Sequence, residues 1–251
     1  MQSELELIRD AFPDRPEMGP ALSRVLLEQV ARGERGPTVR LSRPGRVVAF
    51  GRRDLNSPGY AKAVEAAREA GFGAMERIAG GRAAAYSEGT LSLTITLPDE
   101  APARRSSARF EYAAAIARDA IGELGIDARI GEVEGEYCPG AFSVNSRGRT
   151  KLVGIGQRMI RGAAHVGLVI AVRDAELIRE VLDPVYTAIG LDWNPATVGA
   201  IDDELPAIKL EVVEESLLER IGSESELIQT ALDETTFDLA LSAAPGFRSP
   251  G

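Results

Sequence analysis

Apolar side chains recur at helical spacing in several parts of the chain. In residues 18–34 they recur every three or four positions from Leu22 to Ala31, and Gly33 ends the run. This pattern predicts an amphipathic helix. Further helices are predicted over residues 60–70, 109–124 and 174–182. Residues 183–200 show no such spacing and are predicted to be irregular.

Strict alternation of apolar and polar residues is clearest over residues 91–97, where Leu and Ile alternate with Ser and Thr. A period of two indicates a half-buried strand. The β-branched stretches 38–41 and 47–50 flank Arg43-Pro44-Gly45 and predict a hairpin. Other strands are predicted over residues 128–133, 142–144, 151–160 and 165–172. Their short glycine-containing links require antiparallel neighbours.

Strand hairpins mixed with separated helices indicate an α+β protein with a mostly antiparallel sheet flanked by helices. A doubly wound parallel fold fits this order less well. We expect a main domain over residues 1–200 and an acidic, helical C-terminal extension over residues 201–251. Two helical stretches are predicted within residues 207–241, followed by a frayed tail rich in Ser, Ala, Pro and Gly.

Composition narrows the classes of function. The 251 residues include 29 Lys and Arg against 38 Asp and Glu, a net charge of −9, which argues against a nucleic-acid partner. A hydrophobic content of 44% excludes a mainly disordered chain. Apolar runs are too short for a membrane helix, and the acidic N-terminus is unlike a signal peptide. We therefore expect a cytoplasmic protein with no membrane partner.

Several kinds of chemistry are excluded by the scarcity of Cys and His. With Cys138 and His165 as the single residues of their types, the chain has no intramolecular disulfide, and we expect no metal site. Any catalytic triad that needs a histidine must use His165. The Walker phosphate loop is missing, and so is the third glycine of the dinucleotide fingerprint.

Two glycine-bearing segments are candidates for a site. In Arg77-Ile-Ala-Gly80-Gly81-Arg82-Ala83, paired glycines allow backbone N–H groups to approach a ligand closely, and the arginines supply charge. The alternative is an ordinary glycine turn. The second segment is Glu136-Tyr-Cys138-Pro-Gly140, in which Cys138 lies beside a Pro-Gly turn. This position suits an accessible nucleophile, although a lone cysteine is more often a small buried hydrophobe.

Lys151 stands out because only three lysines occur among the 29 basic residues. Its compact ammonium suits a carbonyl or phosphate oxygen; the alternative is an exposed strand residue. Residues 140–173 contain no Asp or Glu but carry six Arg or Lys and His165, which predicts a local positive field if they share a face. A lone histidine such as His165 is more often structural than catalytic.

These motifs, in this order, resemble the lipoate–protein ligase A and octanoyltransferase family, which is related to biotin–protein ligase. The opening helix and strands ending in Phe50-Gly51-Arg52 look like the start of that catalytic domain. The Arg77–Ala83 segment resembles the acyl-pocket loop, with Arg82 replacing a third glycine. Lys151 to Gln157 resembles the Lys-x-x-Gly-x-Ala-Gln segment, and the strand around His165 resembles the His-His-Gly strand. A biotin ligase fits these segments less well.

The resemblance implies attachment of a lipoyl or octanoyl group to a lysine of a lipoyl-domain protein. In the ligases, ATP and Mg activate free lipoate or octanoate as an acyl-adenylate, and the lysine matching Lys151 contacts the carbonyl. In one octanoyltransferase branch, a cysteine upstream of that lysine takes the acyl group from octanoyl carrier protein as a thioester, without ATP. Cys138 lies near that position, and the Gly80-Gly81-Arg82 form is common in that branch. No permanently bound cofactor is implied.

We therefore expect Cys138 to be the nucleophile and Lys151 to polarise the acyl carbonyl. The resemblance implies substrate binding by Arg77, Gly80, Gly81, Arg82, Gly154, Gly156, Gln157 and His165. One alternative is ATP-dependent ligation without Cys138. Another is a non-catalytic member that binds an acyl group or a lipoyl domain, because Tyr86-Ser87 replaces the family's His-Asp and Val166 follows His165. The other octanoyltransferase branch uses a cysteine within residues 183–190, where this chain has none.

Overall fold

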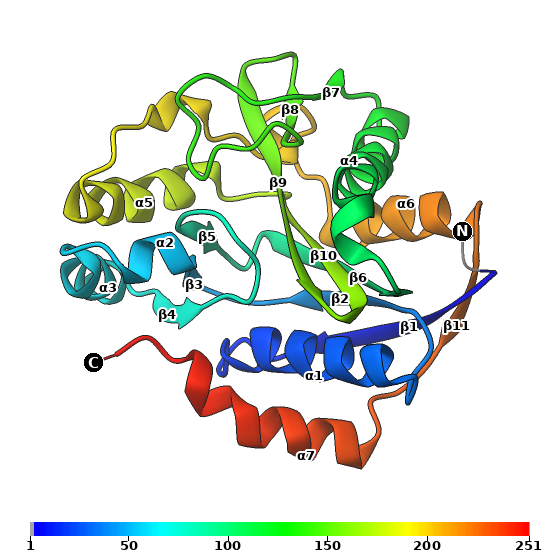
Figure 1. Ribbon diagram of the computed structural model, residues 1–251. Helices are drawn as coiled ribbons and strands as arrows, with labels where there is room; N and C mark the ends of the chain where they lie inside the picture. The colour runs from blue at the N-terminus through cyan, green and yellow to red at the C-terminus, as the bar shows by residue number, and fades with distance from the viewer. Residues whose placement is uncertain (1–2, 251) are drawn as a thin grey trace.

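Helices cover both faces of a large sheet, and a smaller sheet lies beside it (Figure 1). The structure is a computed structural model that describes residues 3–250. The helices are α1 (Met18–Arg32), α2 (Arg52–Leu55), α3 (Tyr60–Glu69), α4 (Ser106–Glu123), α5 (Ala175–Ile189), α6 (Leu210–Gly222) and α7 (Glu234–Ala243). The strands are β1 (Glu4–Ala11), β2 (Thr38–Arg43), β3 (Val47–Phe50), β4 (Gly73–Glu76), β5 (Ala84–Tyr86), β6 (Thr90–Asp99), β7 (Ala128–Ile130), β8 (Val144–Ser146), β9 (Thr150–Ile160), β10 (Gly162–Ala171) and β11 (Glu226–Gln229).

The large sheet has the strand order β11-β1-β2-β6-β10-β9-β8-β7, and the small sheet has the order β4-β3-β5. Parallel pairing in the large sheet is confined to its β11-β1-β2 edge. From β2 to β7 the described neighbours are antiparallel. The predicted α+β class, with a mostly antiparallel sheet flanked by helices, is therefore confirmed.

The alternation in β6 and β10 decides which face of the sheet carries the core. Their apolar residues pack with α4 and α6 on one face: Leu91, Leu93, Ile95, Val166, Leu168 and Ile170. The residues between them, including Ser92, Thr94 and His165, point to the other face and line a cavity. Helix α1 packs over β6 and β10 on that same side. The cavity therefore lies between α1 and the polar face of the sheet.

The predicted hairpin over residues 38–50 is wrong, because β2 and β3 belong to different sheets. β2 pairs with β1 and β6 in the large sheet, whereas β3 lies between β4 and β5 in the small one. Between them Gly45 adopts a left-handed φ of 73° where the chain changes sheet. Each of the four residues of β3 is buried, which is typical of a central strand covered on both faces and not of a half-exposed hairpin arm.

Helix α5 runs on to Ile189, so the prediction that residues 183–200 are irregular is wrong for their first part. Pro184 lies inside the helix, although proline normally interrupts the helical hydrogen bonds. Val185, Tyr186 and Ile189 beyond it are buried in the core shared with α3 and the small sheet. This burial outweighs the local cost of the proline.

The C-terminal extension contains a strand that the sequence patterns did not predict. α6 and α7 confirm two helical stretches, but β11 between them pairs in parallel with β1, an N-terminal strand that was also not predicted. The tail is packed and not frayed, which corrects that expectation. Arg248 bridges to Met75 of β4, and the Tyr60 hydroxyl donates to Ser249 Oγ at 2.9 Å. The domain boundary at residue 200 stays a prediction.

Within residues 3–250, none of the helices has both the length and the apolar character that crossing a membrane requires.

Candidate functional site

The cavity has a cluster of charged and polar side chains at each of two places, and an apolar wall lies between the clusters. The first cluster contains Arg77, Cys138 and Lys151, and the second contains Asp10 and Arg40. The apolar wall includes Phe12, Met75, Ile78 and Val169. A cavity of this kind suits a ligand with a hydrocarbon chain and a reactive group at one end.

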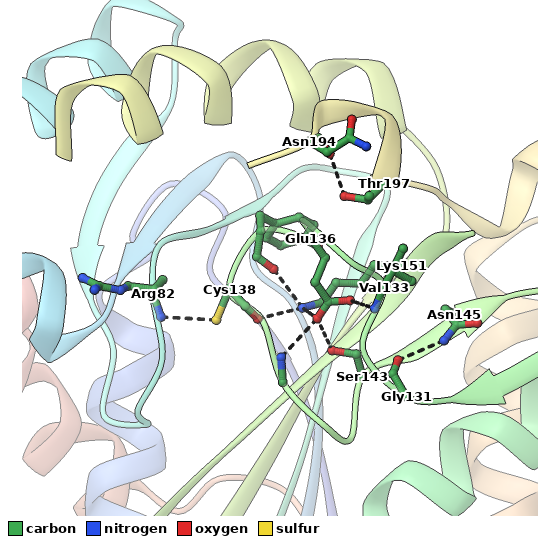
Figure 2. Close-up of polar contacts among 12 residues, drawn as sticks. Arg82, Gly131, Val133, Glu136, Cys138, Ser143, Asn145, Lys151, Asn194 and Thr197 are labelled. Carbon is green, nitrogen blue, oxygen red and sulfur yellow. Dashed lines mark hydrogen bonds and ion pairs between the residues drawn. The ribbon is translucent and has the colours of Figure 1, made fainter. Parts of the chain in front are cut away.

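Cys138 lies in the loop between β7 and β8 and faces the cavity with its side chain half-buried. Its Sγ accepts a hydrogen bond from the backbone N–H of Arg82 at 3.2 Å (Figure 2). A second donor is the guanidinium Nη2 of Arg77, at 3.1 Å. Two donors aimed at one sulfur, one of them cationic, stabilise a thiolate.

The pKa of Cys138 reflects two opposing influences. Burial raises the pKa of the thiol, but the charges of Arg77 and Lys151, with the hydrogen bonds from Arg77 and Arg82, outweigh it. The net effect is a pKa below the ordinary value for a cysteine. Because the thiolate is the nucleophilic form, this environment favours a reactive cysteine over a purely structural one.

The glycine loop comes close to the cysteine because Gly81 has no side chain. Gly81 adopts a φ of 109°, and a Cβ there would lie 2.8 Å from Cys138 Sγ and 2.3 Å from Arg77 Nη2. The side chain of Arg82 forms an ion pair with the fully buried Asp54, in which Arg82 Nη1 lies 3.3 Å from Asp54 Oδ1. The same carboxylate accepts the N–H of Gly51 at 3.0 Å. These contacts fix the loop that offers the Arg82 N–H to the sulfur.

Lys151 is a buried lysine whose ammonium binds the cysteine loop. Its Nζ donates to Glu136 Oε1 at 2.9 Å and to the backbone carbonyls of Tyr137 and Cys138 at 3.0 and 2.9 Å (Figure 2). Glu136 also accepts bonds from Ser143 Oγ and from the backbone N–H of Val133 and Gly140. The ion pair thus ties β9 to the loop that carries Cys138. To polarise an acyl carbonyl, Lys151 has to exchange one of these acceptors.

His165 faces the cavity from β10 and is only 3% exposed. Its Nδ1 lies 3.1 Å from Thr96 Oγ1. Burial lowers the pKa of His165 to about 3, and the charge of Arg40 adds to the effect. The imidazole is therefore neutral near pH 7. Arg40 itself is paired with Asp10, and its Nη1 donates to the backbone oxygen of Gly19 at 3.1 Å.

The depressed pKa of His165 makes stability depend on pH. Between about pH 6.5 and pH 3 the unfolded chain binds a proton that the folded chain excludes, so stability is complete above this window and is lost as the pH falls through it. The free energy of unfolding of the wild type is expected to fall by about 2 kcal/mol between pH 7 and pH 5 because of His165, and His165→Gln is expected to abolish this fall. Urea unfolding at both pH values measures this. Equal losses for wild type and variant would contradict a buried neutral imidazole.

The other residues that the resemblance singled out fall into two groups. Gly154 and Gly156 line the cavity beside Lys151 and the glycine loop, where a Cβ at Gly156 would lie 3.2 Å from Ala79 Cβ. Gly80 borders a second groove, together with Arg77, Arg158 and Phe247. Gln157 lies apart from the cavity, since its amide donates to Ser106 and accepts from Arg109. The structure therefore brings Cys138, Arg77, Arg82, Gly81 and Lys151 together, but not Gln157.

Sequence reasoning missed three residues that hold this arrangement. Glu136 stood in the segment with Cys138, but its pairing with Lys151 across 15 positions had no local signal. Asp54, under Arg82, falls in a short helix that was not predicted. Tyr186 was hidden in the stretch after Pro184 that was predicted to be irregular, yet its hydroxyl contacts the backbone of Cys138.

The described residues 3–250 contain no group of three or more His, Cys, Asp or Glu side chains arranged to hold a metal ion.

Comparison with known proteins gives a consistent result. Residues 15–222 match the family model described as the lipoyl protein ligase A/B catalytic domain. An octanoyl-GcvH:protein N-octanoyltransferase of Anoxybacillus flavithermus is 31% identical over 63% of this chain and 60% of its own length. An enzyme of the same name from Bacillus velezensis is 27% identical over 91% of this chain and 77% of its own length.

Two solved structures share the fold. A crystal structure of lipoate-protein ligase A bound with ATP has a TM-score of 0.77 at 18% identity, covering 96% of this chain and 94% of that chain. A bi-partite lipoate protein ligase from Thermoplasma acidophilum has a TM-score of 0.74 at 17% identity, covering 97% of this chain and 93% of that chain. At this level of identity the likeness concerns the fold.

Proposed function

The chain belongs to the lipoyl protein ligase A/B catalytic domain family, and on that basis we propose that it is an acyltransferase that uses Cys138 as its nucleophile. It transfers an octanoyl or lipoyl group to a lysine of a lipoyl-domain protein. The observation that carries this proposal is the position of Cys138 Sγ at the cavity wall, within hydrogen-bond distance of the Arg82 N–H and the Arg77 guanidinium. The names of the relatives, octanoyl-GcvH:protein N-octanoyltransferases, support the same reaction class.

The reaction has two balanced steps. In the first, the thiolate attacks the acyl carbonyl, the bond from that carbon to the donor breaks, and the departing donor atom takes up a proton. In the second, the acceptor amine attacks the thioester, an amide forms, the thiolate is regenerated and the amine proton leaves to solvent. Each step passes through an oxyanion. We assign its stabilisation to Arg77, because its guanidinium already lies beside the sulfur.

Lys151 has a supporting role in this scheme. Its three N–H groups bind Glu136 and the carbonyls of Tyr137 and Cys138, so it holds the nucleophile loop and places a positive charge behind it. Direct contact with the acyl carbonyl, as the resemblance implies, requires one of these bonds to be released. ATP-dependent ligation, in which the resemblance has the lysine contact the activated carbonyl, requires the same release.

The donor in this proposal is octanoylated GcvH, which the names of the transferase relatives give as their donor, and the acceptor is an apo lipoyl domain. The test incubates the chain with both proteins, without ATP, and follows the intact mass of the acceptor. We expect the acceptor to gain one octanoyl group. Parallel reactions use octanoyl carrier protein as donor, or free lipoate or octanoate with ATP and Mg.

These reactions separate the alternatives. Transfer only from octanoyl carrier protein would keep the cysteine mechanism but contradict the proposed donor. Modification only with ATP and Mg would make the chain a ligase. No modification in any reaction, with ligand or lipoyl domain still bound, would establish a non-catalytic family member.

A further inference from the structure

Cys138 has a backbone conformation that needs support. Its φ is 43°, in the left-handed region that residues other than glycine rarely adopt. Such a conformation is strained and persists where neighbouring groups hold it. The backbone N–H of Cys138 has one partner of this kind, the hydroxyl of Tyr186, at 2.7 Å.

The hydroxyl of Tyr186 connects the cysteine loop with the glycine loop. It accepts from the N–H of Cys138 and donates to the backbone oxygen of Ala83 at 3.0 Å. Ala83 directly follows Arg82, whose N–H donates to Cys138 Sγ. The backbone of the nucleophile and its sulfur are therefore tied to the same short segment, once through Tyr186 and once directly. A shift of either loop changes both contacts.

Tyr186 is suited to this bridge because its side chain is buried and packed. It is 2% exposed, and its ring packs against Trp193 with centroids 5.3 Å apart. Burial raises the pKa of Tyr186 well above its ordinary value, so the hydroxyl keeps its proton and its role as donor to Ala83. Its hydroxyl binds the backbone of Cys138 and of Ala83, so it acts on the cysteine through the backbone.

We propose that Tyr186 is a positioning residue that sets the reactivity of Cys138 by holding the cysteine and glycine loops in register. The inference rests on the proposed function in that Cys138 is taken as the nucleophile. Without the hydroxyl, the N–H of Cys138 loses its acceptor, and the bond from Lys151 to the Cys138 carbonyl alone holds the left-handed conformation less firmly. The sulfur then moves away from the Arg82 N–H and the Arg77 guanidinium, and the thiolate loses its two stabilising donors.

The test is the pH dependence of alkylation in Tyr186→Phe. Because Cys138 is the single cysteine of the chain, iodoacetamide reports on it alone. We expect the apparent pKa of the thiol to rise by about one unit, which lowers the alkylation rate about tenfold at pH values below the wild-type pKa. The limiting rate at high pH stays the same. In acyl transfer, kcat falls while KM for the donor is maintained.

Tyr60→Phe is the matched control. It also removes a buried tyrosine hydroxyl within the same hydrophobic core, but that hydroxyl donates to Ser249 and not to the cysteine loop. Both variants are expected to lose some thermal stability. If Tyr186→Phe changes stability but its alkylation profile coincides with those of wild type and Tyr60→Phe, the residue is purely structural and the inference is overturned.

A measurement on the wild type covers the case in which Tyr186→Phe does not fold. Amide hydrogen exchange of Cys138 is expected to be slow, as for a hydrogen-bonded N–H in a fixed loop. Exchange as fast as in an open loop would contradict the bridge. Alkylation and exchange need no acyl donor, so they test Tyr186 even if the chain fails to transfer an acyl group. Failure of the proposed function is thus distinguished from failure of this inference.

Discussion

Cys138→Ala is expected to lower acyl transfer from octanoylated GcvH by at least about a thousandfold, because the chain has no other cysteine to form a thioester. The fold is expected to remain intact, since the side chain is half-buried and small. Transfer is followed as the rate at which the acceptor gains the acyl mass. Full activity in Cys138→Ala would reduce the cysteine to a packing role.

Cys138→Ser provides the control for packing and hydrogen bonding. A serine oxygen accepts from the Arg82 N–H as the sulfur does, but its hydroxyl is far less acidic than a thiol. We expect Cys138→Ser to be as stable as wild type and nearly as inactive as Cys138→Ala. If serine restores wild-type turnover, the chemistry does not depend on a thiolate.

Lys151→Met is expected to have the largest effect on stability, about 3–5 kcal/mol. Lys151 is 1% exposed and Glu136 is 3% exposed, and the substitution leaves the Glu136 carboxylate buried without its counter-ion. The carbonyls of Tyr137 and Cys138 also lose their donor. Urea unfolding near pH 7 measures the free energy of unfolding. Lys62→Met, which removes an exposed lysine, is expected to leave it almost unchanged.

A double variant separates the charge of Lys151 from its role in the site. In Lys151→Met/Glu136→Gln neither side chain is charged, so part of the lost stability is expected to return. Acyl transfer is expected to stay low, because the loop that carries Cys138 still lacks the ammonium that held it. A single variant as stable as wild type, or a double variant with full activity, would contradict this role.

Local alternation over residues 91–97 predicted a strand, and β6 spans that stretch. The alternation over residues 91–97 separates the apolar face of β6 from Ser92 and Thr94, which line the cavity. The segments around Arg77, Cys138 and Lys151 were each recognised locally, and the structure brings them within hydrogen-bond distance of one another. Their roles in catalysis stay predictions.

What the patterns missed depends on contacts between distant parts of the chain. The parallel pairing of β1 with β11 joins the two ends of the chain, and no short-range period indicates it. Tyr186 was missed because Pro184 is a local helix-breaking signal, which tertiary burial of α5 overrides. Glu136 carries a meaning only once the fold places Lys151 against it.

The central claim is that the acyl group passes through a thioester on Cys138. The most direct measurement is the intact mass of the chain after incubation with octanoylated GcvH, without ATP and without an acceptor. A thioester requires a gain of one octanoyl group that maps to Cys138 and is removed by hydroxylamine. Transfer to an added lipoyl domain with no such adduct on the chain, or an adduct on another residue, would contradict the claim.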